Sequence, residues 1–407
     1  MNLHLSLAWR NLWRNKRRSL IAVSSVLFAV VIALATRSMQ LGSYQQMIRN
    51  VVSFYTGYAQ VQAPGFQDSR SLNDSFILTD DLVRSIAEIR GITSTAPRLE
   101  SFGLISSGTM TEGCIILGVA PDLEDRFTGL RRRLTVGAYL GETKNGILLA
   151  QGLAQNLLVA PGDTVIILSQ GYHGVTAAGR FVVAGVVEFP SPELNRRLAY
   201  LTLCDAQYLF DAPDRITSLS IMVDHPKRLA SGLAALKTAY AGKYAVLSWE
   251  DMMPELVQMI ETDNASGVIM LFIIYMVIGF GILGTVLMMT MERNREFGML
   301  IAVGMKRSRL RAVVIIESVL LTSIGVVAGT LVGIPVLLYF YYHPIRLSGE
   351  LAEYIIRFGF EPILPFSLEP RIFIAQALSV LLIALIASIY PVWRISRIHP
   401  VTALRSG

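Results

Sequence analysis

Residues 267–311 read "GVIMLFIIYMVIGFGILGTVLMMTMERNREFGMLIAVGMKRSRLR" and join two opposite kinds of sequence. The run from Gly267 to Met291 is apolar and exceeds the ~20 residues that a helix needs to cross the hydrocarbon core of a bilayer. A basic patch between Arg293 and Arg311 follows directly. Lys and Arg residues beside a membrane span mark its cytoplasmic side. The stretch therefore predicts a membrane-spanning helix that ends in a basic segment on the cytoplasmic face.

The composition of the whole chain also indicates a membrane protein. Of its 407 residues, 53% are hydrophobic and 16% are charged, and the mean hydropathy is +0.50. Soluble domains carry about 25% charged residues. The net charge of +6 is compatible with nucleic-acid binding, but the basic residues cluster beside the apolar runs, where the positive-inside rule places them. We therefore interpret the basic residues as markers of the cytoplasmic side of the membrane, and we expect no nucleic acid partner.

Four apolar segments divide the chain into membrane and aqueous parts. Each is long enough to cross a bilayer, and the expected spans are residues 19–40, 266–292, 312–342 and 372–392. The basic residues assign both chain ends and the 293–311 segment to the cytoplasm. The parts between and after the spans are an extracytoplasmic insert at 41–265, an extracytoplasmic loop at 343–371 and a cytoplasmic tail at 393–407. We predict a four-helix membrane protein with a large α+β extracytoplasmic domain.

The residues before the first span predict a helix that lies in the membrane interface over residues 1–18. Leu5, Trp9 and Trp13 recur every four residues and form an apolar stripe. A cleaved signal peptide is the alternative, because Ala33 to Ala35 resemble a peptidase site behind a basic leader. The apolar core is longer than the roughly 7 to 15 residues of a signal peptide, so we favour a retained first span.

The insert at 41–265 is predicted to contain both α-helices and β-strands. It combines β-rich runs such as "DTVIILS" (163–169) with helical patterns such as "DDLVRSIAEI" (80–89). Its length is sufficient for a core of its own and for two subdomains. Cys114 and Cys204 show no metal or redox spacing. We therefore favour two buried free thiols, with a single disulfide as the alternative.

Aromatic residues gather just after the first span, at Phe54, Tyr55 and Tyr58. Aromatic side chains near a membrane surface usually anchor to lipid headgroups. The alternative is that they line an access path for an amphiphilic substrate.

The sequence contains no catalytic motif that we can identify. It lacks the G-x-x-x-x-G-K-[ST] phosphate loop, the G-x-S-x-G elbow and H-E-x-x-H, and its five histidines are scattered. We therefore expect a non-catalytic protein with no metal and no cofactor of its own. If it uses ATP, another chain must hydrolyse the nucleotide.

The basic segment at 293–311 predicts a short amphipathic helix. We expect the second membrane helix to continue through Arg293 and Arg295, to stop near Gly298, and to be followed by a helix over "MLIAVGMKRSRLRA". The residues expected on its apolar side are Met299, Leu300, Val303, Leu310 and Val313, opposite Lys306, Arg307 and Arg309. Such a helix fits a partner's groove or anchors to headgroups, and the pattern alone does not decide between them.

Four stretches together resemble the FtsX-like permease family, the membrane subunits of MacB-type and Lol-type ABC transporters. "ERNREFGMLIAVGMKRSRL" (292–310) is similar to the signature E-R-x-R-E-[FI]-G-x-L-[RK]-A-[ILV]-G. The others are "AWRNLWRNKRRSLIAVSSV" (8–26), "IIESVLLTSIGVVAGTLVG" (315–333) and "YPVWRISRIHPVTALR" (390–405). "GLAQNLLVAPGDTVIIL" (152–168) resembles the extracytoplasmic core of many members. The resemblance covers nearly the whole chain.

The resemblance implies a type VII ABC transporter permease in the bacterial inner membrane. The ATPase would be a separate dimeric subunit that carries ATP and Mg²⁺, and a second permease chain, identical or related, would complete the complex. The layout is closest to permeases that release lipoproteins, which implies an amphiphilic cargo and, further on, a periplasmic acceptor. MacB-type efflux of peptides or drugs and FtsX-type signalling to a periplasmic enzyme are the alternatives.

By the same resemblance, the signature segment would be the coupling helix that docks on the ATPase. Its matching residues are Glu292, Arg293, Arg295, Glu296, Phe297, Gly298, Leu300, Ala302, Val303 and Gly304. One position departs from the family pattern, because Ile301 replaces an Arg or Lys. A charge contact from that position would be missing here.

Polar and small residues inside the spans point to helix packing. Glu317 lies within the third span, where a charge is costly. We favour a structural pairing, for which Arg311 or headgroup water is within reach, over a proton-transfer site. Glycines at close spacing predict close helix approach within one chain or between two. They are Gly279, Gly281 and Gly284 in the second span and Gly325, Gly329 and Gly333 in the third.

Overall fold

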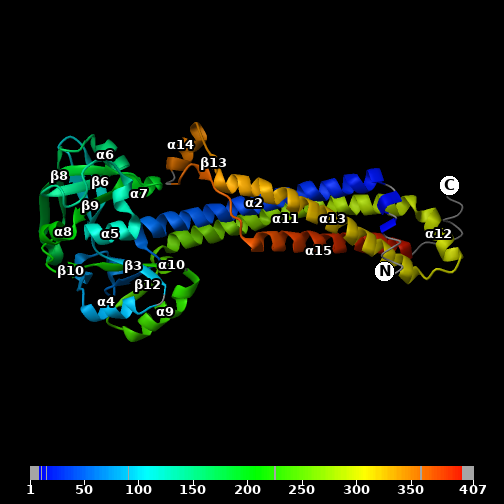
Figure 1. Cartoon of the computed structure of the whole chain (residues 1–407), viewed down its shortest axis with the longest axis horizontal. Helices are drawn as coiled ribbons and strands as arrows, with labels where there is room; N and C mark the ends of the chain where they lie inside the picture. Colours follow the sequence, from blue (N-terminus) through cyan, green and yellow to red (C-terminus); the bar gives the residue numbers. More distant parts are fainter. Residues whose placement is uncertain are drawn as a thin grey trace. The chain divides into compact units, whose positions relative to one another are not determined.

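The computed structural model describes residues 9–10, 12–14, 16–89, 91–223, 226–357 and 360–396. These residues fold into two compact units (Figure 1). The helical unit comprises the described parts of 1–45, 260–346 and 363–407, and the sheet unit those of 46–259 and 347–362. Most of the predicted N-terminal helix and C-terminal tail lies outside the described residues. Trp9 and Trp13 are described, and both are exposed.

Four helices of the described chain are long and apolar enough to cross a membrane, as predicted (Figure 1). They are α2 (Lys16–Val51), α11 (Pro254–Glu292), α13 (Arg307–Tyr342) and α15 (Pro370–Ser396). Two of them extend well beyond the expected spans, since α2 continues past residue 40 and α11 begins before residue 266. The 36 residues of α2 correspond to about 54 Å at the rise of an α-helix. A hydrocarbon core is about 30 Å thick, so part of this helix must project into water.

Helix α13 is the most enclosed of the four. Half of the residues in its apolar 18-residue stretch are buried, against 17% in the corresponding stretch of α11. Its three glycines, at four-residue spacing, face α2: a Cβ atom at Gly325 would lie 2.6 Å from Cβ of Val26, and one at Gly329 would lie 2.9 Å from the carbonyl oxygen of Leu27. These glycines therefore serve packing within one chain. In α11, by contrast, Cβ atoms at Gly281 and Gly284 would meet no atom of the described part of the chain within 4 Å.

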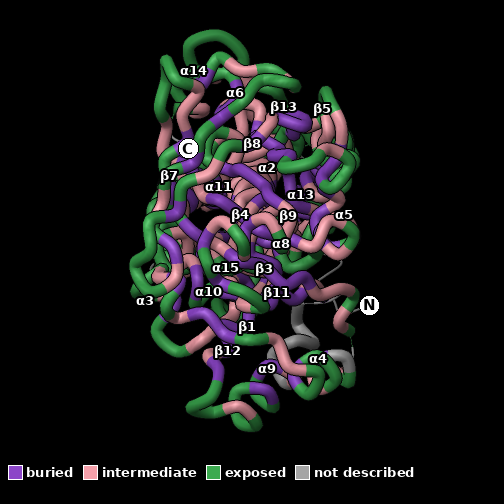
Figure 2. The backbone as a smooth tube through the Cα atoms, turned by 90° about the vertical axis from the view of Figure 1, so that its left-hand side faces the viewer, coloured by how far each residue is buried: buried purple, intermediate pink, exposed green. Residues whose placement is uncertain are grey.

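The sheet unit is built on one ten-stranded mixed sheet with the order β12-β1-β11-β3-β4-β9-β6-β8-β5, in which β7 pairs with β3 and β8. The strands are β1 (Ala59–Gln62), β3 (Ile92–Ser106), β4 (Thr111–Val119), β5 (Leu134–Gly137), β6 (Gly146–Ala150), β7 (Thr164–Gln170), β8 (Thr176–Val187), β9 (Leu198–Thr202), β11 (Ser218–Val223) and β12 (Ala245–Ser248). Central strands such as β6 and β9 are almost entirely buried (Figure 2).

Short helices cover the sheet and fill its connections. They are α3 (Phe66–Ser69), α4 (Asp80–Ala87), α5 (Pro121–Thr128), α6 (Gln151–Leu157), α7 (Pro192–Arg197), α8 (Leu203–Leu209), α9 (Pro226–Ala239) and α10 (Trp249–Met252). Helix α14 (Glu350–Arg357) lies in the segment between α13 and α15. Single turns are η1 (Val52–Thr56), η2 (Leu72–Asp74), η3 (Leu130–Arg133) and η4 (Tyr172–Gly174). Small two-stranded sheets pair β2 (Phe76–Ile77) with β10 (Arg215–Ile216) and β13 (Ile345–Arg346) with β14 (Ile363–Leu364).

The long strand β3 connects two lobes of the sheet unit. Its residues up to Arg98 pair with β11, and those from Arg98 onward pair with β4. One hydrophobic core gathers around β1, β11 and β12 with α4 and α9, and others gather around β4, β6, β8 and β9. Arg98 therefore lies where the two lobes meet.

Both cysteines are free, but only one is buried. Cys114 belongs to β4 and points into the core, where burial raises the pKa of its thiol to about 12. Cys204 is exposed, so the expectation of two buried thiols is wrong for this residue. The reason is its position at the start of α8, on the solvent side of that helix.

Candidate coupling segment and buried ion pairs

The basic segment folds differently from its prediction. Helix α11 ends at Glu292, and a separate helix α12 (Asn294–Ala302) begins after a single intervening residue, Arg293. The predicted helix break near Gly298 is wrong, since Gly298 is buried inside α12. The predicted short helix through Arg311 is wrong as well, because the turn at Gly304, with φ of +101°, ends α12 and Arg307 starts α13. Glycine adopts this backbone conformation without the steric cost that a Cβ atom would add.

The inner face of α12 and its N-cap pack on the helical unit. Arg293, Phe297 and Ile301 follow one another at four-residue spacing, and Arg293 and Phe297 are 5% and 4% exposed. Phe297 belongs to the same apolar cluster as Leu310 of α13, and Ile301 packs against that cluster. Ile301 thus packs against apolar side chains of the helical unit. An Arg or Lys side chain in this place would lose its hydration.

Arg293 forms a buried ion pair with Glu317 of α13. Nη1 and Nη2 of Arg293 donate to the two carboxylate oxygens, each over 2.8 Å, and Glu317 is only 6% exposed. This two-point geometry is among the strongest that an arginine forms with a carboxylate. The expected structural pairing of Glu317 is present, but the suggested partner Arg311 is wrong. Arg293 reaches Glu317 because the chain turns between α11 and α12.

The outer face of α12 carries an exposed apolar patch formed by Met299, Leu300 and Val303, which are 47%, 40% and 89% exposed. We call these three residues the α12 patch. Leu310 and Val313, expected on the same side, are instead buried in the helical unit. Exposed basic residues follow the patch along the chain, at Lys306, Arg307 and Arg309.

Most of the remaining signature residues are exposed as well. Glu292, Arg295, Ala302 and Gly304 are exposed. Glu296 pairs with Arg14 of the N-terminal segment. In the described part of the chain, no three His, Cys, Asp or Glu side chains are placed to hold a metal ion.

Two family descriptions match the sequence: "MacB-like periplasmic core domain" over residues 19–239 and "FtsX-like permease C-terminal" over residues 268–400. The chain belongs to the FtsX-like, MacB-type family of ABC transporter permeases. This permease is therefore a multi-pass subunit of an ABC transporter in the inner membrane, with the layout of the type VII class.

Named relatives of this permease fall into two groups. It is 26% identical over 423 residues to the "Lipoprotein-releasing system transmembrane protein LolC" of Xylella fastidiosa (strain 9a5c), covering 96% of each chain. It is 23% identical over 385 residues to the "Macrolide export ATP-binding/permease protein MacB 1/2" of Paracoccus denitrificans, covering 88% of this chain and 56% of that relative. The crystal structure of the periplasmic region of MacB from Actinobacillus actinomycetemcomitans covers 53% of this chain and 97% of its own, at 18% identity and a TM-score of 0.36, too low to support a conclusion.

The aromatic residues after the first span are partly buried and pack against the cores of the sheet unit of the permease. Phe54 and Tyr55 sit in the turn η1, and the ring of Phe54 lies 3.8 Å from the guanidinium of Arg133. Tyr55 donates to Glu100 over 2.5 Å, and Tyr58 packs half-buried against the other lobe. Neither predicted role, headgroup anchor nor access path, fits these contacts. The reason is that α2 continues to Val51 and delivers the aromatics into a folded domain.

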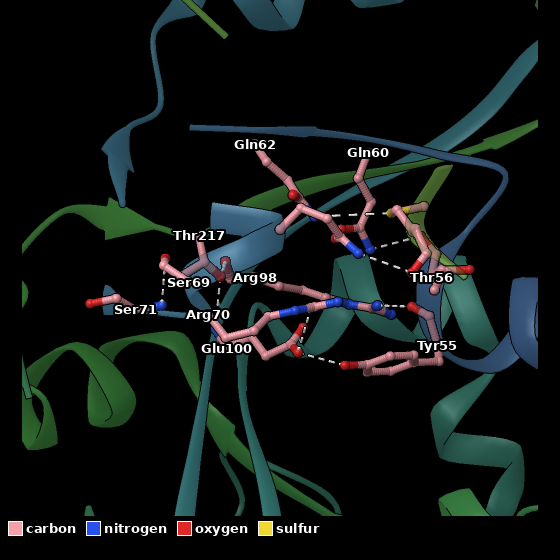
Figure 3. Close-up of polar contacts among 12 residues, drawn as sticks. Tyr55, Thr56, Gln60, Gln62, Ser69, Arg70, Ser71, Arg98, Glu100 and Thr217 are labelled. Atoms are coloured by element: carbon pink, nitrogen blue, oxygen red, sulfur yellow. Dashed lines mark hydrogen bonds and ion pairs between the residues drawn. The ribbon is translucent and has the colours of Figure 1, made fainter. Parts of the chain in front are cut away.

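A second buried ion pair, which the sequence analysis missed, lies at the junction of the two lobes. Arg98 donates from Nε and Nη2 to Glu124 over 3.0 and 2.6 Å, and the side chains are 1% and 0% exposed. Burial alone would lower the pKa of Arg98, but the adjacent Glu124 carboxylate raises that pKa above its usual value. Arg98 also donates to the carbonyl of Tyr55, as Figure 3 shows. The turn that follows α2 is thereby fixed to both lobes.

Glu100 extends this network toward the surface. Its carboxylate accepts from Tyr55 and from Arg70, the latter over 3.3 Å (Figure 3). Thr217 accepts from the backbone N–H of Glu100 over 2.9 Å. The turn η1, which follows the C-terminal end of α2, is therefore held by directional contacts with charged and polar groups.

Proposed function

We propose that this permease releases lipoproteins, or another amphiphile, from the outer leaflet of the inner membrane. The support is its similarity to the "Lipoprotein-releasing system transmembrane protein LolC" over 96% of both chains. In this proposal both chain ends and α12 face the cytoplasm and the sheet unit faces the periplasm, as the basic flanks of the spans favour.

The energy comes from a separate ATPase subunit that docks on the α12 patch. Three exposed apolar side chains on one face of a short helix suit a hydrophobic groove, and the basic residues that follow suit an acidic rim. Complete burial of a Val, Leu or Met side chain stabilises by about 1.5–3 kcal/mol relative to leaving it exposed. This exposed patch, held in place by Arg293 and Phe297, is the observation that carries the proposal.

A second permease chain completes the complex in this proposal. Helix α11 is the least buried of the four membrane helices, and Gly281 and Gly284 leave an open face on it. Small residues let helix backbones approach closely within a membrane. Movement of α12 then reaches the sheet unit as a mechanical displacement, because α2 is a single helix that belongs to both units.

Export in the manner of MacB is the second candidate function. The similarity to the Paracoccus denitrificans protein over 88% of this chain favours it. Mass spectrometry of the complex purified from its native membrane separates the two: bound lipoprotein supports release, and bound peptide or drug supports export. A bound cell-wall hydrolase, with neither kind of cargo, would support signalling and contradict both.

Docking is tested by the double substitution Leu300→Asp and Val303→Asp. We expect the ATPase to be lost from a pull-down while the permease stays in the membrane, because two carboxylates in an apolar groove are left without hydration. The matched control is Val136→Asp with Leu158→Asp, which places the same charges on exposed apolar positions of the sheet unit. Retention of the ATPase by the α12 variant would refute the docking site.

A further inference from the structure

Arg293 occupies a mechanically special position in the permease. It is the one residue between α11 and α12, and its backbone, with φ of −94° and ψ of 5°, interrupts the helical path there. Its side chain crosses to Glu317, within α13, through two contacts of 2.8 Å. One end of α12 is thus joined covalently to α11 and by ion pairing to α13.

The surroundings of this ion pair are closed. Val286, Met289, Phe297, Val314 and Leu321 line it together with polar Thr290 and Ser318. The remaining cavity is about 10 Å³, on the scale of a single water molecule. With Arg293 5% and Glu317 6% exposed, the ion pair is therefore largely shielded from bulk water and from salt.

Stability alone does not explain a buried ion pair at this place. Desolvation of two charges offsets most of their attraction, and apolar residues of similar volume often hold a fold equally well. The pair also fixes how the start of α12 is oriented relative to α13, because the planar guanidinium group sets both the distance and the angle to the carboxylate. Phe297, the neighbouring apolar contact, sets no such angle.

The contacts of α13 continue this connection toward α2. At Gly325 and Gly329 the backbone of α13 meets Val26 and Leu27 of α2 at distances that leave no room for a methyl group. Helix α2 then extends without interruption to Val51. The glycines of α11 at positions 281 and 284 make no comparable contact with the described residues.

We propose that Arg293 and Glu317 form a positioning pair that transmits displacement of α12 to α13, and through the glycine contacts to α2. The inference rests on the proposed docking of an ATPase at the α12 patch. It assigns transmission to a rigid polar joint between α12 and α13, whereas α11 meets that joint through its covalent link and through the packing of Val286, Met289 and Thr290.

The test replaces the pair by Arg293→Met with Glu317→Met in the full permease, assembled with its ATPase in nanodiscs. Hydrogen exchange is measured with and without a non-hydrolysable ATP analogue and Mg²⁺, which needs no knowledge of the cargo. In the unmodified complex we expect nucleotide to change exchange in α12, in residues 313–333 of α13 and in residues 41–51 of α2. In the variant we expect the change to stay in α12 and to fall at least fivefold in the other two segments.

Two further variants keep the test decisive. Arg293→Lys retains the charge but loses the fork, so the same loss of response is expected even if the Met pair folds poorly. Ser318→Ala is the control, because Ser318 is buried beside Glu317 but bonds only to Val314 of its own helix in the described structure. We expect it to respond like the unmodified protein.

The outcomes separate this inference from the proposed function. If the variants retain the ATPase and respond to nucleotide in α13 and α2 like the unmodified complex, the positioning role is refuted and docking stands. If the unmodified permease retains no ATPase, docking and the positioning role are both refuted.

Discussion

Arg98 and Glu124 form an ion pair that is almost completely buried in the sheet unit, so the loss of either charge should destabilise this unit strongly. Glu124→Gln removes one charge and leaves the Arg98 guanidinium buried without a counter-ion. The loss of one partner of a buried pair costs ~3–5 kcal/mol, so we expect the urea midpoint of the sheet unit to fall sharply. Pulse proteolysis of the full-length protein across a urea series measures this change.

The matched control is the exposed ion pair of Arg131 and Glu142, whose side chains are 54% and 51% exposed over a contact of 3.3 Å. Glu142→Gln removes the same charge in water, where such a pair contributes less than ~1 kcal/mol. Equal effects of the two substitutions would show that the Arg98 site is hydrated in solution, contrary to the structure.

Sequence reasoning finds some of these residues and not others for a physical reason. Glu317 stands out because a carboxylate inside an apolar span is rare and costly. Its partner does not, because Arg293 belongs to a basic segment where arginines are expected near headgroups. The pairing of Arg98 with Glu124 joins a strand to the following helix, and neither spacing nor periodicity marks it.

At the scale of elements, the contact between α13 and α2 yields a prediction about one methyl group. Gly325→Ala would place a Cβ atom 2.6 Å from Cβ of Val26 and 3.2 Å from the carbonyl oxygen of Val23. Overpacking of this kind costs ~1–3 kcal/mol. We therefore expect a lower midpoint of thermal unfolding in detergent.

The control for this substitution is Gly284→Ala in α11, which adds the same methyl group where nothing lies within 4 Å. Alanine is the better helix former by ~1 kcal/mol, so this variant should be at least as stable as the original in the isolated chain. A stable Gly325→Ala variant would mean that the two helices are further apart than described.

The limits of prediction are clear for α12 and for the aromatics after α2. Amphipathic periodicity puts Leu300, Val303 and Leu310 on one apolar side, but tertiary packing buries Leu310 and leaves Leu300 and Val303 exposed. Hydropathy locates the first span but cannot tell where its helix ends, because residues 41–51 of α2 are mostly buried or half-buried against other parts of the protein and follow no membrane constraint. Hydropathy therefore predicts Phe54 and Tyr55 at a membrane surface, whereas both belong to the sheet unit.

At the scale of the whole molecule, hydropathy predicts most of the architecture. Four apolar segments and one long insert suffice to indicate a four-helix membrane protein with a large α+β domain, since a bilayer sets the length of every span. Strand order in the sheet unit was not predictable, because pairings such as β4 with β9 join segments about 80 residues apart. The orientation of the molecule rests on the basic flanks and is open to direct test.

The native cysteines make that test possible without engineering the sheet unit. Cys204 is exposed, whereas Cys114 is buried with a thiol pKa of about 12. A membrane-impermeant maleimide reacts with the thiolate form, so Cys114 stays unreactive at pH 7 and still at pH 9. If the sheet unit faces the periplasm, cells with a permeabilised outer layer should be labelled at Cys204 alone, and Cys204→Ser should abolish the signal.

Two engineered positions in the Cys204→Ser background complete the assignment. Asp163→Cys, exposed in the sheet unit, should react in the same cells, whereas Ser308→Cys, exposed at the start of α13, should react only after the inner membrane is opened. Labelling of Ser308→Cys in sealed cells, with none at Asp163→Cys, would reverse the topology. The α12 patch would then lie on the opposite side of the membrane from a cytoplasmic ATPase. The ATPase could not dock there, and ATP hydrolysis could not move α12 through such a contact.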